Sequence, residues 1–165
     1  MNKNAMEKTY IICVEDQREV LNTVLKDLEI FEGPFFLEGC ESADEAEELL
    51  DELDAQGDYV GLMVCDHVMP GKSGVQLLID VNKDGRFRHT KKLLLTGLAT
   101  HQDTIEAINQ AAIDRYIEKP WNVEILQKQA RILLTRFLFD QGLNYEPFLP
   151  VLDKETVLER LRRMG

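Results

Sequence analysis

Residues 59–71 read YVGLMVCDHVMPG, an uncharged run that passes directly into Asp66 and then into a Pro-Gly turn. The unbroken apolar character of Tyr59 to Cys65 predicts a strand buried on both faces, as in a parallel sheet covered by helices. Turn residues Pro70 and Gly71 predict a loop shortly after the acid. The stretch therefore predicts a central parallel strand with a carboxylate at its carboxyl end.

Apolar strand-like runs alternate with helical periodicity on both sides of this stretch, up to about residue 139. Further strands are expected at 10–14, 34–37, 92–95 and 113–117, and helices near 20–28, 41–54, 75–81, 105–112 and 121–139. Such alternation is typical of βαβ units. We expect an α/β fold, a flavodoxin-like doubly wound five-stranded parallel sheet, (βα)5, with a C-terminal helical extension.

Composition excludes several classes of function. The chain has 165 residues and a formal net charge of −11, which argues against sequence-independent binding to nucleic acid. No apolar run approaches the roughly 18–20 residues that span a bilayer, and residues 1–8 lack a secretion signal, so we expect a cytoplasmic protein without a membrane partner. Cysteines 13, 40 and 65 lie in apolar runs, which predicts buried free thiols.

Polar residues follow four of the predicted strands. Glu15 and Asp16 follow the first, Asp66 the third, Thr96 the fourth and Lys119 the fifth. Because the carboxyl ends of parallel strands share one edge, three carboxylates should meet there, and Mg²⁺ would relieve their repulsion. A carboxylate beside a phosphoryl donor can form an acyl phosphate, with the lysine and the threonine positioning the transferring oxygens.

At these residues the sequence resembles the response-regulator receiver domains of two-component signalling systems, over roughly residues 9–135. The resemblance rests on five pieces in order: Glu15-Asp16, Asp66-His-Val-Met-Pro-Gly71, Gly74, Leu93-Leu-Leu-Thr-Gly97 and Tyr116-Ile-Glu-Lys-Pro120. It implies a phosphoprotein switch that is not a turnover enzyme. Its donor would be a histidine kinase or phosphotransfer protein, and it would relay phosphorylation by conformational change to a downstream protein or a fused output domain.

The resemblance also implies roles for the residues of the acidic edge. Asp66 would be the phosphoacceptor, and with Asp16 a direct Mg²⁺ ligand. Glu15, where the family more often has Asp, would act on the metal mainly through water. The backbone carbonyl of Val68 would complete the protein ligands.

Other members of the motif would change conformation or position the phosphate. Thr96 and Tyr116 would form the switch pair, and Lys119 would contact Asp66 or its phosphate, aimed by a cis bond to Pro120. His67 is interpreted as loop surface without a chemical role.

Two apolar residues depart from polar positions that help to place water in the family. Val68 and Leu98 lie two residues past Asp66 and Thr96, and we expect slow self-dephosphorylation from them. Val68 also stands where a haloacid-dehalogenase-like phosphohydrolase, the enzyme alternative, needs an aspartate. A third alternative is a degenerate receiver that acts only as a protein-interaction module, against which the intact acidic, threonine and lysine set argues.

The chain continues beyond the receiver pattern. We expect an N-terminal tail at 1–8, a receiver domain at 9–139 and a connector with a short helix at 140–165. Asp153 is expected to cap that helix, which carries Val157, Leu158, Leu161 and Met164 at helical spacing. The segment could pack on the receiver as an arm, form a homodimer or partner surface, or begin an output domain.

Overall fold

Five parallel strands form one sheet in the computed structural model of the chain, which describes residues 7–97 and 102–165. The strands lie in the order β2-β1-β3-β4-β5. The chain therefore runs from β1 outward to β2 and then returns past β1 to β3, and ligand sites of open α/β sheets lie where the direction reverses in this way. The bounds are β1 (Thr9–Val14), β2 (Phe36–Cys40), β3 (Tyr59–Asp66), β4 (Lys91–Thr96) and β5 (Arg115–Glu118).

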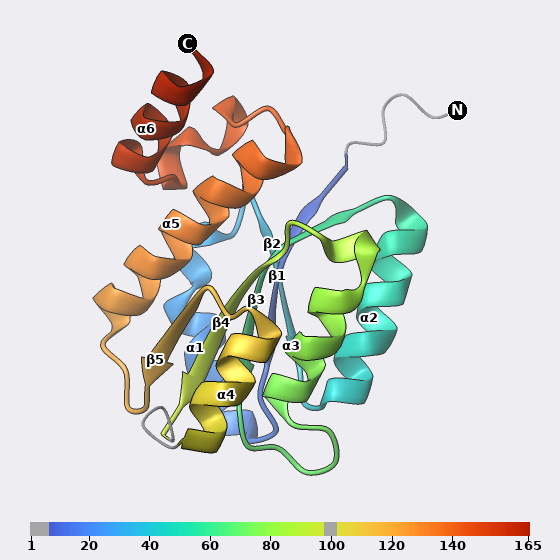
Figure 1. Cartoon of the computed structure of the whole chain (residues 1–165). Coiled ribbons are helices and arrows are strands. Elements are labelled where there is room, and N and C mark those ends of the chain that lie inside the picture. The colour runs from blue at the N-terminus through green and yellow to red at the C-terminus, as the bar shows by residue number, and fades with distance from the viewer. Residues whose placement is uncertain (1–6, 98–101) are drawn as a thin grey trace.

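Helices cover both faces of the sheet, with α1 and α5 on one side and α2, α3 and α4 on the other (Figure 1). This arrangement confirms the predicted flavodoxin-like doubly wound fold. The helices are α1 (Arg18–Asp27), α2 (Ala43–Gln56), α3 (Gly74–Lys83), α4 (Gln102–Ala111), α5 (Val123–Gln141) and α6 (Lys154–Met164), with 3₁₀ helices η1 (Glu29–Phe31), η2 (Gly85–Phe87) and η3 (Glu146–Val151). None of the helices in the described part of the chain is both long and apolar enough to cross a membrane.

Alternation along β1 shows why the apolar runs form a two-sided core. Ile11 and Cys13 pack with α1 and α5, whereas Ile12 and Val14 pack with α2 and α3. All four side chains are essentially inaccessible to solvent. Successive residues of a strand point to opposite faces, so a strand covered on both sides must be apolar at every position.

Strand β2 differs from its expected position. It begins at Phe36 and runs to Cys40, whereas the apolar run predicted 34–37. Phe35 instead packs in the core just before the strand, and Glu38 and Gly39 become extended because they pair with β1. The pairing partner, which the local sequence does not reveal, decides these limits at the edge of the sheet.

A helical extension follows the receiver pattern, as expected. Helix α5 ends at Gln141, and Gly142 adopts a φ of +76° that turns the chain sharply out of the helix. The chain then forms η3 and α6, and we call residues 142–165 the C-terminal arm. Asp153 caps α6, because its Oδ2 accepts a hydrogen bond of 3.1 Å from the amide of Thr156.

The C-terminal arm packs on α5 at the end of the molecule opposite the carboxyl ends of the strands (Figure 1). Leu152 and Val157 are buried in the same core cluster as the inner face of α5. The ring of Phe148 lies 4.7 Å from that of Phe35, measured between centroids. These contacts attach the arm to the apolar core of the domain.

An ion triad adds to this attachment. Asp140, in the last turn of α5, accepts a hydrogen bond of 2.6 Å from Lys91 Nζ at the start of β4. Its other oxygen lies 2.6 Å from Arg160 Nη1 of α6. One carboxylate therefore joins the sheet, α5 and the arm.

Candidate functional site

Three carboxylates meet at the carboxyl ends of β1 and β3. Glu15, Asp16 and Asp66 each offer an oxygen such that the three atoms all lie within 4.8 Å of one another. Glu15 is 3 % exposed and Asp66 7 % exposed. The clustering predicted from the parallel strand ends is therefore present in the structure, and hard oxygen donors at this spacing fit a divalent cation such as Mg²⁺.

Lys119, which follows β5, points into this cluster. Its Nζ lies 2.6 Å from Asp66 Oδ1 and 2.9 Å from Glu15 Oε1. Its backbone amide donates a hydrogen bond of 3.1 Å to the carbonyl of Thr96, and its peptide bond to Pro120 is cis, as the resemblance implied. The lysine thus bridges two carboxylates, although the sequence had suggested a contact with Asp66 alone.

Burial and hydrogen bonding act on the ionisation of this cluster in opposite directions. Burial raises the pKa of Glu15, and hydrogen bonds from Lys119 and the Gln17 amide offset part of the rise. Burial also disfavours a charged Lys119, but its hydrogen bonds to Asp66 and Glu15 outweigh this and raise its pKa. The ammonium therefore stays charged near neutral pH, and one cation faces three acids.

The start of α3 presses against the backbone of Asp66. A Cβ atom built on Gly74 would lie 1.7 Å from the carbonyl oxygen of Asp66, far inside van der Waals contact. The Gly74 amide also donates a hydrogen bond of 2.9 Å to the carbonyl of His67, and Ser73 caps the helix. Only glycine fits here, a requirement that the motif spacing did not indicate by itself.

The residues proposed as a switch pair lie in different environments. Thr96, the last residue of β4, is 1 % exposed, whereas Tyr116 in β5 is 52 % exposed. The neighbouring β4 residue Leu94 is the register partner of Tyr116. Tyr116 thus lies on the surface, whereas Thr96 is buried and has Glu118 as its register partner.

Residues next to Asp66 include one exposed and one partly buried side chain. Val68 is 63 % exposed. The Nδ1 atom of His67 is buried and has no hydrogen-bond partner among the described residues. Leu98, the second apolar departure, lies outside the described residues.

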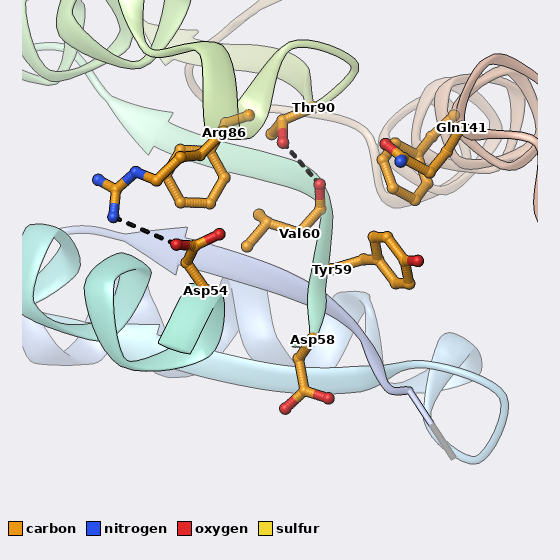
Figure 2. A pocket seen from close by; sticks show the side chains of 9 residues that line it. Asp54, Asp58, Tyr59, Val60, Arg86, Thr90 and Gln141 are labelled. Carbon is orange, nitrogen blue, oxygen red and sulfur yellow. Dashed lines mark hydrogen bonds and ion pairs between the residues drawn. The ribbon is translucent and has the colours of Figure 1, made fainter. Parts of the chain in front are cut away.

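Two hollows lie away from the acidic edge. The one in Figure 2 lies at the start of β3, where Arg86 reaches toward Asp54 and Thr90 Oγ1 donates a hydrogen bond of 2.7 Å to the Val60 carbonyl. Its volume of about 20 Å³ suffices for a water molecule. A groove of about 100 Å³ lies between α2 and α3, where Arg86 lies among several acids. Neither contains residues of the acidic edge.

Comparison with known proteins identifies the family. The sequence model of the response regulator receiver domain matches residues 11–131. This chain belongs to the response regulator receiver domain family. Members of the family are phosphoacceptor signalling switches and not enzymes in the usual sense, and they work with histidine kinases and output domains. The resemblance and the predicted class of function are therefore confirmed.

Individual relatives show how much of a protein this receiver spans. Chemotaxis protein CheY-3 of Vibrio cholerae is 30% identical over 134 residues, which cover 78% of this chain and 91% of CheY-3. The hydrogenase transcriptional regulatory protein HoxA of Cupriavidus necator is 36% identical over 80 residues, which cover 48% of this chain but 15% of HoxA. The signal receiver domain of an HD domain-containing protein from Pseudomonas fluorescens Pf-5 superposes with a TM-score of 0.68 at 26% identity, covering 79% of this chain and 98% of that domain.

Proposed function

We propose that Asp66 is the phosphoacceptor of this receiver. The observation that carries the proposal is the position of its carboxylate, which is buried, lies among the acids that follow β1 and contacts Lys119 Nζ at 2.6 Å. The Asp66 oxygen would attack the phosphorus of a phosphohistidine on a histidine kinase or phosphotransfer protein. The new P–O bond forms as the P–N bond breaks, and the departing imidazole keeps the electron pair and takes a proton from solvent.

The residues that would hold Mg²⁺ are Asp16 and Asp66 directly, the Val68 backbone carbonyl, and Glu15 through water. The bound ion would neutralise charge on the transferring phosphoryl oxygens. Lys119 supplies a second positive charge there, and for this role its amine must exchange a carboxylate oxygen for a phosphoryl oxygen. The Thr96 hydroxyl would hydrogen-bond another of these oxygens.

The conformational relay would run from Thr96 to Tyr116. In our proposal Thr96 moves toward the phosphorylated Asp66, and the exposed ring of Tyr116 turns inward beside it. The surface formed by α4 and β5 then changes, and a downstream protein or a fused output domain reads the change. The free, buried cysteines are those expected of a protein that works in the reducing cytoplasm.

Incubation with Mg²⁺ and acetyl phosphate, read by intact mass, tests the proposal. We expect one phosphoryl group on the wild-type chain, none on Asp66→Asn, and one on Asp58→Asn, a control aspartate at the other end of β3. Beryllofluoride should change the emission of the single tryptophan, Trp121, only when Asp66 and Mg²⁺ are both present. Continued release of phosphate would support a phosphohydrolase, and no modification would support an interaction module.

A further inference from the structure

Helix α6 has two faces of different character. Thr156 and Val157 are buried against the rest of the domain. Leu158, Leu161 and Met164 are 53 %, 36 % and 73 % exposed. These three residues recur every third position and so form a stripe along one side of the helix. The described part of the chain does not cover this stripe.

The acids and the arginines of α6 lie in different parts of the helix, and Lys154 lies at its first position. Glu155 and Glu159 lie in its first part, and Arg160, Arg162 and Arg163 in its last. Arg160 is paired with Asp140 and Arg163 with Glu159. Within residues 7–97 and 102–165, Glu155 and Arg162 take part in no ion pair. Glu155 and Arg162 therefore lie about two turns apart and, with the exposed Lys154, are available for a contact outside the chain.

We propose that α6 pairs with α6 of a second copy of this chain, in antiparallel orientation. In a two-fold contact the same surface serves both copies, so Leu158 of one copy packs on Leu161 of the other, and the reverse contact forms as well. The two-fold rotation that relates the copies also brings Glu155 of each copy close to Arg162 of the other. Two hydrophobic contacts and two ion pairs thus arise from one helix.

The positions of Glu155 and Arg162 select this orientation. A parallel pair would set Glu155 against Glu155 and Arg162 against Arg162, and like charges at an interface oppose association. The antiparallel pair also suits the net charge of −11, because α6 lies at the far end from the acidic edge and the two acidic domains extend away from each other (Figure 1). A second copy is therefore the occupant that this self-complementary surface fits.

The proposed contact is small. A single pair of three-turn helices buries less than the roughly 1,200 Å² of standard stable interfaces. We expect a weak dimer, in exchange with the monomer at protein concentrations of roughly 10–100 µM. Because α6 lies far from Asp66, the dimer should form without Mg²⁺ and in Asp66→Asn, so its presence does not depend on the phosphoacceptor assignment.

Sedimentation velocity of the full chain across a concentration series tests the pairing. Glu155→Arg and Arg162→Glu should each weaken association by roughly tenfold or more, because two attractions become two repulsions. The double variant Glu155→Arg/Arg162→Glu should recover it, and an equimolar mixture of the two single variants should form a heterodimer. Leu158→Ser/Leu161→Ser should abolish association. All four positions are exposed, and circular dichroism checks that the variants fold.

Three outcomes would overturn the proposal. The first is a wild-type chain that stays monomeric throughout the series. The second is association that survives both single charge reversals, which would place the contact elsewhere. The third is a double variant or a mixture that fails to recover association, which would show that Glu155 and Arg162 do not meet across the two-fold axis and that α6 binds another partner.

Discussion

Lys119 Nζ lies 2.9 Å from Glu15 Oε1, and the same ammonium contacts Asp66 at 2.6 Å. The lysine therefore balances part of the negative charge of the acidic edge from within the protein. A metal ion bound by the carboxylates, or a phosphoryl group on Asp66, would change what this lysine contacts. The contact of Lys119 with Glu15 should thus stabilise the metal-free domain, and binding of a metal ion at the site should change this contribution.

Replacement of this lysine should make stability depend more strongly on Mg²⁺. In Lys119→Met the carboxylates of Glu15 and Asp66 lose their shared cation, and we expect the free energy of unfolding without metal to fall by about 1–3 kcal/mol. Saturating Mg²⁺ should restore more stability to the variant than it adds to the wild type. Urea unfolding with and without Mg²⁺ measures both quantities.

Lys72→Met is the matched control, because Lys72 also bridges two acids, Glu47 and Asp80, but these acids are more exposed and do not belong to the acidic cluster. We expect a loss of less than about 1 kcal/mol and no added response to Mg²⁺. An equal response of the two variants to Mg²⁺ would contradict the role of the Lys119 bridge.

Gly74→Ala should displace the backbone of Asp66 through a steric clash. Its new methyl group would overlap the Asp66 carbonyl oxygen, so α3 and the strand end must move apart. We expect destabilisation of at least about 3 kcal/mol and a slower modification of Asp66 by acetyl phosphate. Gly85→Ala, where a Cβ meets nothing within 4 Å, should change stability by less than about 1 kcal/mol and leave modification unaltered. Similar losses in both variants would exclude the steric explanation.

Asp140 makes the attachment of the C-terminal arm sensitive to acid. Burial raises its pKa, but hydrogen bonds from Lys91 and Arg160 outweigh burial and hold the pKa below the ordinary value of 3.8. The carboxylate therefore stabilises the folded state fully above pH 3.8, and this stabilisation is lost as the pH falls through its lower folded pKa. Asp140→Asn should cost about 1–3 kcal/mol at neutral pH.

The difference between wild type and Asp140→Asn should shrink as the pH falls below 3.8, measured by chemical unfolding at a series of pH values. Asp51→Asn serves as control, because its side chain is 69% exposed and its pair with Arg86 should contribute less than about 1 kcal/mol. A cost of Asp140→Asn that is unchanged in acid would mean that packing, and not charge, is lost in the variant.

Exposed Val68 offers a test of phosphate lifetime. A polar side chain two residues from Asp66 could hold the attacking water, so Val68→Asn should speed decay of the acyl phosphate by roughly 3- to 100-fold. The double variant Val68→Asn/Leu98→Glu should decay faster still. Decay of the modified protein is followed by intact mass, with Val123→Asn as a control at another exposed valine. If all variants decay at the wild-type rate, the apolar residues do not limit hydrolysis.

The sequence predicted those features that depend on the common direction of the strands. Each apolar run that ends in a polar residue puts that residue on one edge, so the meeting of Asp16, Asp66 and Lys119 could be expected before the side-chain geometry was known. The alternation of strands and helices predicted the layers of the fold for the same reason. The charged residues of the candidate site can therefore be predicted from the sequence pattern.

Features that depend on contacts between residues distant in sequence could not be predicted from the sequence. The limits of β2 depend on pairing with β1, and the bridge from Lys119 to Glu15 depends on the length of the glutamate in a three-dimensional site. The helical periodicity of α6 was visible, but which of its apolar residues the core would accept was not. Val157 is buried whereas Leu158 is exposed, because the docking angle of the arm decides between them.

The position of the C-terminal arm also bears on how such a protein can diversify. The arm is attached through Phe148, Leu152 and Asp140 to the end of the domain that is remote from Asp66 (Figure 1). Mutations that lengthen, recharge or replace it leave the acidic edge and the start of α3 untouched. Natural selection, or a protein engineer who grafts a new module there, can thus alter which partners bind this receiver. The residues of the acidic edge stay the same.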